Sequence, residues 1–291
     1  MISKQDVHAF EDLLRSVSSA KKGYLMINSP GGDANAAEKL LIMCRERFTE
    51  EFNIIVPDYA KSAATMIVLG SDKILMGYLA ELGPIDPQLQ LQPVPVPGGT
   101  IPARSFIDGL NMIRDRVVKD GDPVQIYLPM LSQIRPEVVA MSQRAIEDAE
   151  TLARKWLEKY MLKDDPEQAK NVARWLSSGE MYKSHGKVID FQEAKSVLKL
   201  NVEKIDPTSM LWSEIWELYC RSTHFLSQRT RQGAAKLFES ESVSFTISVQ
   251  ALLARAPSPP QPMPPPPQPA PGEPTKPQPG KPPTQPSSST A

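Results

Sequence analysis

The chain has 291 residues, 33 basic and 34 acidic side chains, and a formal net charge of −1. A composition of 41% hydrophobic and 23% charged residues is that of a folded globular protein, which excludes a wholly disordered or fibrous chain. The balanced charge leaves no basic excess for nucleic-acid phosphates, so we expect no nucleic-acid partner.

The first third of the chain alternates between helix-like and strand-like segments. Apolar residues recur at spacings of three and four in the helical segments, and the strands are short apolar runs bounded by turn residues. The predicted order is a helix over 7–17, a strand over 23–28, a helix over 36–48, a strand over 53–56, a short helix ending at 69 and a strand over 73–76. This alternation predicts an α/β fold with a parallel sheet and helices stacked on it.

The following part of the chain is predicted to be mostly helical. Three prolines and two glycines within 93–99 predict an irregular loop. Helices are then predicted over 105–119, 136–162, 166–176, 191–198 and 209–228. Pro136 suits a first helical turn and Asp190 suits an N-cap. The last of these helices is expected to bury Leu211, Ile215, Trp216 and Tyr219.

The C-terminal segment differs sharply from the rest in proline content. Sixteen of the 29 prolines lie within 256–291, a density that favours polyproline II over helix or sheet. We therefore predict one domain over 1–255 and a disordered proline-rich tail over 256–291. The PxxP strings of the tail could bind an SH3-like partner, but a plain spacer is the simpler interpretation, because any segment this rich in proline contains such strings.

The cysteines and the apolar runs indicate the cellular environment. Cys44 and Cys220 show no CxxC or Cys/His spacing, so we expect two buried free thiols, with neither a disulfide framework nor a metal site. The longest apolar run, Ala63–Leu69, is far shorter than the ~20 residues needed to cross a bilayer, and the polar N-terminal segment does not resemble a signal peptide. A cytoplasmic protein without an integral membrane segment is predicted.

Two loops contain the residues that could carry chemistry. Gly31 and Gly32 follow the first predicted strand, and Ser62 lies where a short helix begins after the second strand. In parallel α/β sheets such loops gather at the carboxyl edge, where ligands bind. A serine there, beside glycine N–H groups, suits acyl transfer: Ser62 would attack a carbonyl, and the N–H groups of Gly31 or Gly32 and of Ala63 would stabilise the oxyanion.

Both features also have simpler explanations. A Gly-Gly pair after a strand can be only a tight turn, and a serine at a helix start is most often an N-cap. A phosphate-binding loop is a further alternative, but the sequence contains neither GKS or GKT nor GxGxxG.

Four segments resemble those of one group of enzymes. MINSPGGDANAAEKL (26–40) resembles the INSPGG segment of the proteolytic subunit of Clp protease, and AKSAATMIVLGSDKI (60–74) resembles the nucleophile helix of signal peptide peptidase A. With LGPIDPQ (82–88) and SSGEMYKSHGKVIDFQEAKSVLKLNV (177–202), they make the chain most similar to the serine dehydrogenase proteinase family of the Clp–crotonase fold, over about residues 20–205.

The resemblance implies a spiral of parallel strands with packed helices, and a serine peptidase that acts on a peptide or protein substrate without a cofactor. It also implies assembly into a homo-oligomer. Matched position by position, it implies Ser62 as the nucleophile, with Gly31, Gly32 and Ala63 as oxyanion donors. A dehydrogenase activity is not expected, because no dinucleotide fingerprint follows the first strand.

The resemblance leaves the general base open. In the Clp subunit the histidine falls about where Asp86 stands here, and the stretch 125–136, which matches the lysine region of signal peptide peptidases, contains no lysine. His185, in a family-like segment, is one candidate base, and Lys119 is another as a displaced lysine. Lys61 is a weaker candidate, because neighbours on an extended segment point in opposite directions.

Asp86 has two interpretations. It lies between two prolines in a stiff turn, where it could orient a base or cap its own turn.

Two other functions compete with the peptidase. A catalytically silent Clp-fold oligomeric scaffold is favoured by the missing family base and by the proline-rich tail. A crotonase-like acyl-thioester enzyme would use a similar oxyanion site and would require a coenzyme A pocket.

Overall fold

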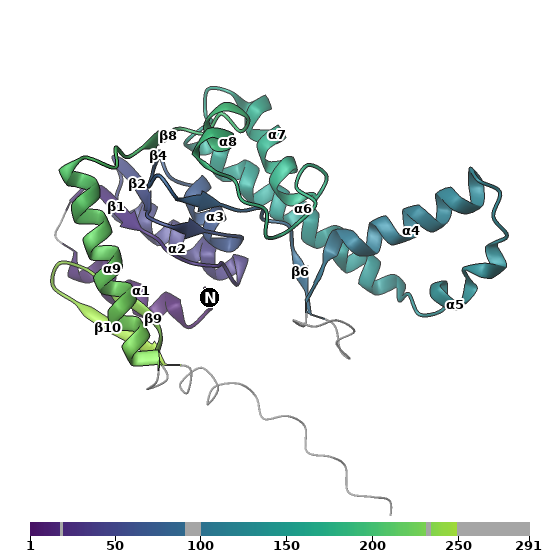
Figure 1. The fold of residues 1–291 in the computed structure, drawn as a ribbon, viewed down its shortest axis with the longest axis horizontal. Helices are drawn as coiled ribbons and strands as arrows, with labels where there is room; N and C mark the ends of the chain where they lie inside the picture. Colours follow the sequence, from purple (N-terminus) through teal and green to yellow (C-terminus); the bar gives the residue numbers. More distant parts are fainter. Residues whose placement is uncertain (18–19, 91–99, 231–233, 249–291) are drawn as a thin grey trace, which may run out of the picture. The chain divides into compact units, whose positions relative to one another are not determined.

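The computed structural model describes residues 1–17, 20–90, 100–230 and 234–248, and a four-stranded parallel sheet forms its centre (Figure 1). The strands lie in the order β1 (Lys22–Met26), β2 (Glu51–Val56), β4 (Lys73–Met76) and β8 (Val202–Lys204). All three strand pairings are parallel. The predicted α/β class, with a parallel sheet and packed helices, is confirmed.

Several helices share a core with one face of this sheet, and the first three in the chain pack there. They are α1 (Asp6–Ser16), α2 (Ala34–Arg47) and α3 (Ala63–Leu69). Side chains alternate between the two faces of a strand, and the alternate β2 residues Phe52, Ile54 and Val56 are fully buried in that core. The apolar run that forms α3 is buried along its whole length, which explains why this short helix is apolar on every side.

The other face of the sheet packs against α9 (Met210–Thr230). Trp212 and Ile215 are buried there against partly buried sheet residues, namely Met26, Ile55 and Leu75. Gly77 lies so close to the Trp212 ring that a Cβ would overlap it. The helix is close to the predicted one, but Leu211, which was predicted to be buried, is exposed, because the inward face of α9 begins one residue later, at Trp212.

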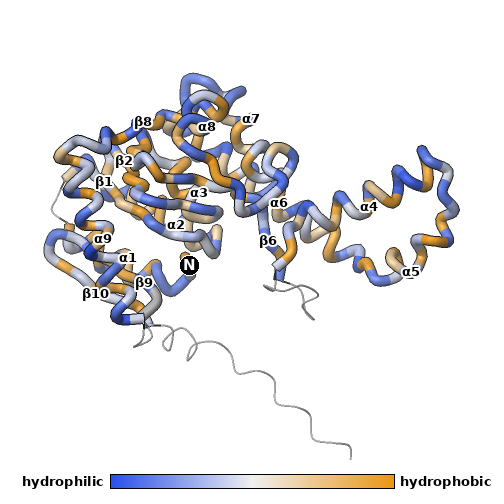
Figure 2. Tube along the Cα trace, in the orientation of Figure 1, coloured by the Kyte–Doolittle hydropathy of each residue, from blue (hydrophilic) through white to orange (hydrophobic). Residues whose placement is uncertain are grey.

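The remaining helices form a mainly helical segment. They are α4 (Ala103–Val118), the 3-10 turn η1 (Val124–Ile126), α5 (Leu128–Leu131), α6 (Pro136–Lys159), α7 (Pro166–Ser177) and α8 (Phe191–Ser196). Helices α4 and α6 pack together, and both alternate between hydrophobic and hydrophilic residues along their length (Figure 2). Between α4, α5 and α6 lies a hollow of about 440 Å³ whose lining includes Leu110, Leu131 and Val139. Asp190 caps α8 as predicted, accepting the Glu193 N–H at 2.8 Å.

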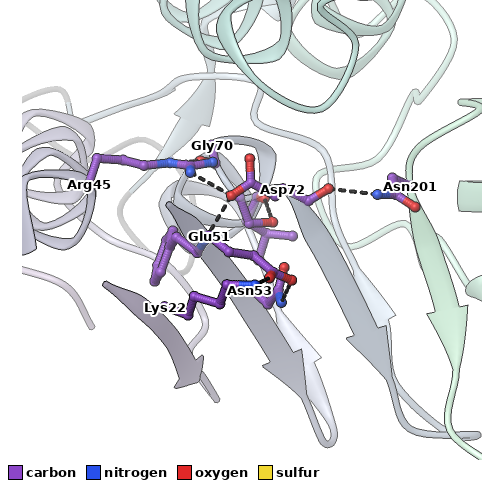
Figure 3. A network of polar contacts seen from close by, with 10 residues as sticks. Lys22, Arg45, Glu51, Asn53, Gly70, Asp72 and Asn201 are labelled. Carbon is purple, nitrogen blue, oxygen red and sulfur yellow. Dashed lines mark hydrogen bonds and ion pairs between the residues drawn. The ribbon is translucent and has the colours of Figure 1, made fainter. Parts of the chain in front are cut away.

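A polar network stabilises the amino ends of β2 and β4 (Figure 3). The Nη1 of Arg45 lies 2.7 Å from Asp72 Oδ2, and Arg45 Nε donates to the carbonyl of Gly70 at 2.8 Å. The same carboxylate oxygen accepts the Phe52 N–H at 2.7 Å. The guanidinium also lies 3.4 Å from the centre of the Tyr160 ring, a cation–π contact. This network lies at the end of the sheet opposite to the loops that contain the candidate site.

A hairpin of β9 (Ala234–Glu239) and β10 (Ser244–Ser248) is absent from the sequence prediction. It packs against α1 and α9. Phe238 stacks on Phe245 with ring centres 5.5 Å apart and meets Phe10 edge-on at 6.4 Å. A second short antiparallel pair joins β6 (Gln88–Leu89) to β7 (Ile101–Pro102).

Several other predictions can be compared with the structure. Cys44 is buried as expected, and burial raises the pKa of its thiol, whereas Cys220 is exposed, contrary to expectation. The described ranges contain no helix that is long and apolar enough to span a bilayer. The predicted loop at 93–99 and the predicted tail at 256–291 lie outside the described residues, so the domain boundary at 255 stays a prediction.

Candidate functional site

Four short extended segments lie side by side beyond the carboxyl edge of the main sheet. Strand β3 (Tyr59–Ala60) pairs with β5 (Glu81–Leu82) in parallel. Ser29 bridges to Ala60 on one side of this pair, and Leu82 bridges to Ile189 on the other. A predicted site residue lies within two to four positions of each segment: Gly31 after Ser29, Ser62 after β3, Asp86 after β5 and His185 before Ile189. The pairing therefore gathers residues that are up to 154 positions apart in the sequence.

Ser62 connects β3 to α3 in an unusual backbone conformation. Its φ is 53° and its ψ is −122°, and Lys199 is the other non-glycine residue with positive φ in the described part of the chain. Such a conformation is strained for a residue with a side chain and is often found at functional sites. The Ser62 side chain makes no capping hydrogen bond to α3, so the simpler interpretation of this serine as an N-cap is not supported.

Gly31 lies directly against the turn that contains Ser62. A Cβ added to Gly31 would lie 2.6 Å from the Lys61 carbonyl oxygen, 2.7 Å from Ser62 Cβ and 2.9 Å from the Ala63 nitrogen. The φ of Gly31 is +96°, a region that favours glycine. The glycine loop and the serine turn are thus in direct contact, as the sequence predicted, and a side chain at position 31 would force them apart.

Hydrogen bonds determine which amide groups in these two turns are free. The Gly31 N–H donates to Ser29 Oγ at 3.2 Å, so it is used within its own loop. The Ser62 carbonyl accepts the Met66 N–H at 3.2 Å as part of the first turn of α3. The Ala63 N–H belongs to the same peptide group and points the opposite way, out of the helix.

Thr65 joins the serine turn to the turn that contains Asp86. Its side chain is fully buried, and its hydroxyl donates to the carbonyls of Ala60 at 2.7 Å and Gly83 at 2.9 Å as alternative acceptors. The same oxygen accepts the Gly83 N–H at 3.2 Å. Thr65 is not among the predicted site residues, although a polar residue inside the apolar 63–69 run is a signal that could have identified it.

His185 and Asp86 form a close pair. His185 Nδ1 lies 2.7 Å from Asp86 Oδ1, and the exposed fractions of the two side chains are 31% and 6%. The other carboxylate oxygen accepts the side-chain amide of Gln88 at 2.8 Å. An ionised carboxylate can only accept hydrogen bonds, so in the neutral imidazole Nδ1 carries the proton and Nε2 is left as the basic nitrogen.

The two lysine candidates have other partners. Lys61 Nζ lies 2.9 Å from Glu81 Oε1 and donates to the carbonyls of Leu82 at 3.1 Å and Lys187 at 3.3 Å. Its ammonium therefore makes three charge-assisted contacts and connects the serine turn to the segment that follows His185. These contacts give the Lys61 side chain other partners and do not support it as the base.

Lys119 lies at the C-terminal end of α4, with its side chain 68% exposed and paired with Asp115 at 2.8 Å. This placement corresponds to a solvated helix end and does not support the prediction of a displaced catalytic lysine.

The described residues can be searched for a group of side chains that could hold a metal ion. Among the residues that the structure describes, no group of three or more His, Cys, Asp or Glu side chains is placed to hold a metal ion. The chemical groups that are present, a strained serine, a histidine–carboxylate pair and free amide N–H groups, suit acyl transfer by the protein alone.

Two curated relatives from the archaeon Methanocaldococcus jannaschii match much of the chain. Uncharacterized protein MJ0137 is 29% identical over 214 residues, which are 72% of this chain and 63% of that protein. Uncharacterized protein MJ1495 is 29% identical over 174 residues, which are 58% of this chain and 50% of that protein. The chain therefore spans less than two thirds of the length of the curated relatives it matches.

Two solved structures of the 1510-N membrane-bound stomatin-specific protease are distantly similar. One is a serine-to-alanine mutant, with 16% identity and a TM-score of 0.42 over 70% of this chain and 74% of that one. The other is a lysine-to-alanine mutant in complex with a substrate peptide, with 15% identity and a TM-score of 0.44 over 85% of this chain and 83% of that one.

A family model matches the part of the chain that contains both turns of the site. The match covers residues 2–120, and its description is ClpP-like SDH-type serine proteinase. It includes Gly31, Ser62 and Asp86, whereas His185 lies beyond it. The resemblance predicted from the motifs is confirmed as a match: residues 2–120 are similar to the ClpP-like SDH-type serine proteinases.

Proposed function

We propose that the chain is a serine peptidase in which Ser62 is the nucleophile, His185 the general base and Asp86 the residue that orients the base. The hydrogen bond between His185 Nδ1 and Asp86 Oδ1 carries this proposal. It supports His185 among the candidate bases that the resemblance to the family left open. A histidine held by a buried carboxylate, with Nε2 free, is the arrangement that activates serine hydroxyls in unrelated peptidases.

The chemistry follows from these groups. As Ser62 Oγ attacks the peptide carbonyl, His185 Nε2 takes the hydroxyl proton and Asp86 stabilises the imidazolium that forms. The carbonyl oxygen becomes negatively charged and accepts hydrogen bonds from the N–H groups of Gly32 and Ala63. His185 then gives the proton to the leaving amine, and a water molecule activated in the same way releases the acyl group from Ser62.

Gly32 is preferred to Gly31 as the oxyanion donor. The resemblance implied both, but the Gly31 N–H already donates to Ser29 Oγ. The Ala63 nitrogen would lie 2.9 Å from a Cβ added to Gly31, so a carbonyl oxygen held by the Ala63 N–H would lie beside the glycine loop. One such donor contributes on the order of 3 kcal/mol to lowering the barrier.

A fluorophosphonate probe and a set of fluorogenic peptides test the proposal. We expect wild-type protein to be labelled at Ser62, and both labelling and hydrolysis to be lost in Ser62→Ala. His185→Gln should lower the labelling rate by at least 100-fold, and Lys119→Met, the matched control for a lysine outside the site, should label like wild type. Labelling that is equally fast in wild type and in folded His185→Gln would contradict the assignment of the base.

A catalytically silent oligomeric scaffold is the second candidate function. Apolar side chains are exposed on the helical segment, including Val118, Ile126, Leu128 and Met130. Exposed apolar side chains of this kind are available for a subunit contact. Folded wild-type protein that neither labels at Ser62 nor cleaves any peptide would favour the scaffold over the peptidase.

A further inference from the structure

The glycine loop is held from outside by the backbone of Ile2. The Ile2 N–H donates to the Gly31 carbonyl at 2.7 Å, and the Asp33 N–H donates to the Ile2 carbonyl at 2.9 Å. Ile2 and Gly32 thereby form an isolated parallel bridge. A Cβ on Gly32 would overlap the Ile2 backbone, so glycine is required for this close approach.

The bridge determines the direction of one amide group. In a trans peptide the C=O of one residue and the N–H of the next point to opposite sides. Because the Gly31 carbonyl is bonded to Ile2, the Gly32 N–H points away from Ile2. Glycine has no side chain to oppose rotation of this peptide plane, so the hydrogen bond from Ile2 helps to maintain the orientation of the proposed oxyanion donor.

A buried ion pair anchors the segment that contains Ile2. Lys236 Nζ lies 2.5 Å from Asp6 Oδ1 and 2.8 Å from Asp6 Oδ2, and it donates to Ser3 Oγ at 2.9 Å. Asp6 also accepts the Ser3 N–H at 2.7 Å. The side chains of Lys236 and Asp6 are only 11% and 2% exposed. Ser3 follows Ile2 directly, so this pair fixes the residue next to the bridge.

We propose that the Lys236–Asp6 ion pair is a positioning device for the glycine loop, acting through Ser3 and Ile2 on the peptide between Gly31 and Gly32. The expected effect on catalysis rests on the proposed function. The structural coupling between the β9–β10 hairpin and the glycine loop, called the link below, does not. Lys236 lies on β9, more than 200 residues from the glycine loop in sequence. The hairpin is therefore part of the framework that holds this loop. Lys236 and Asp6 are positioning residues and touch no substrate.

The variant Lys236→Met tests the link. It keeps most of the length of the side chain and removes the charge. Arg45→Met is the matched control, because the buried Arg45 side chain also forms an ion pair, with the half-buried Asp72, at the opposite end of the sheet. Amide hydrogen exchange under native conditions, followed by NMR, measures the opening of the bridge directly. We expect the Asp33 amide to exchange at least 10-fold faster in Lys236→Met than in Arg45→Met after correction for global stability.

Kinetics test the consequence for catalysis. In Lys236→Met we expect kcat to fall at least 10-fold, with KM within about 3-fold of wild type, because the donor acts on the transition state. Lys236→Arg keeps the charge and should restore most of kcat and of the protection of Asp33. If Lys236 only stabilises the fold, the Asp33 amide exchange rate and kcat should change in proportion to the loss of global stability, and to the same extent in Lys236→Met and Arg45→Met.

Other outcomes separate this inference from the proposed function. If wild-type Ser62 does not label but Asp33 loses protection in Lys236→Met, the peptidase proposal fails and the link stands. If Ser62 labels but Asp33 exchanges alike in Lys236→Met and Arg45→Met, the link is overturned and the peptidase proposal stands. If Lys236→Met does not fold, Asp6→Asn replaces it as a milder change, with the same expected loss of protection at Asp33.

Discussion

The backbone conformations of Gly31 and Ser62 are coupled, because the loop that contains Gly31 packs directly against the strained turn that contains Ser62. The backbone of Ser62, at φ 53°, is a conformation that L-residues rarely adopt. The atoms around Gly31, including Ser62 Cβ, leave no space for a methyl group. A change at position 31 should therefore act directly on the turn that contains Ser62.

Gly31→Ala should reduce both activity and stability. The added Cβ would meet backbone atoms that cannot move independently, and the φ of +96° is unfavourable for alanine. We expect at least a 100-fold loss of fluorophosphonate labelling. Gly109→Ala is the matched control, because Gly109 lies within α4 with no atom within 4 Å of its added Cβ. That change should leave labelling intact and stabilise the protein by roughly 0.5–1 kcal/mol in urea unfolding.

At the residue level, the sequence predicted local backbone geometry but not which distant residues contact each other. Paired glycines after a strand and a serine before an apolar helix have local signatures, so both turns could be predicted. The contact between His185 and Asp86 joins residues 99 positions apart, and no local pattern encodes it. The same holds for Ile2 and Lys236, whose contacts with the loop and with Asp6 depend on how the chain ends pack.

The short elements of the site are joined by backbone hydrogen bonds and by buried side chains such as Thr65. Strands β3 and β5 are two residues each, too short to show an alternating pattern, which is why the sequence analysis did not predict them. The longer elements, such as β2, α6 and α9, have a clear period and were predicted within a few residues. The short strands are held in register by groups such as the Thr65 hydroxyl, which contacts both segments.

Thr65→Val tests this dependence at the level of the elements. Valine has nearly the same shape but leaves the carbonyls of Ala60 and Gly83 and the Gly83 N–H without the hydroxyl. Buried groups that lose a hydrogen-bond partner cost about 1–3 kcal/mol, so we expect a loss of this size in the free energy of unfolding. Thr65→Ser, which keeps the hydroxyl, should lose less, and equal losses in the two variants would show that only packing matters there.

For the whole molecule, the hairpin and the segment after it should differ in their contribution to stability. The hairpin packs Phe238 between Phe10 and Phe245 and supplies Lys236 to the buried Asp6. Composition alone predicts that residues 256–291 bury little surface. The chain should therefore tolerate removal of the tail but not of the hairpin.

Two truncations compare these contributions by calorimetry. Ending the chain after Arg255 should leave Tm almost unchanged. Ending it after Thr230 leaves Asp6 as an uncompensated buried charge, which costs about 3–5 kcal/mol, so Tm should fall by about 10 °C, given roughly 2–4 °C per kcal/mol for a chain of this size. The same truncation combined with Asp6→Asn should recover part of the loss, because it removes the unpaired charge. A fall in Tm of similar size after Arg255 would show instead that the proline-rich segment docks on the folded domain.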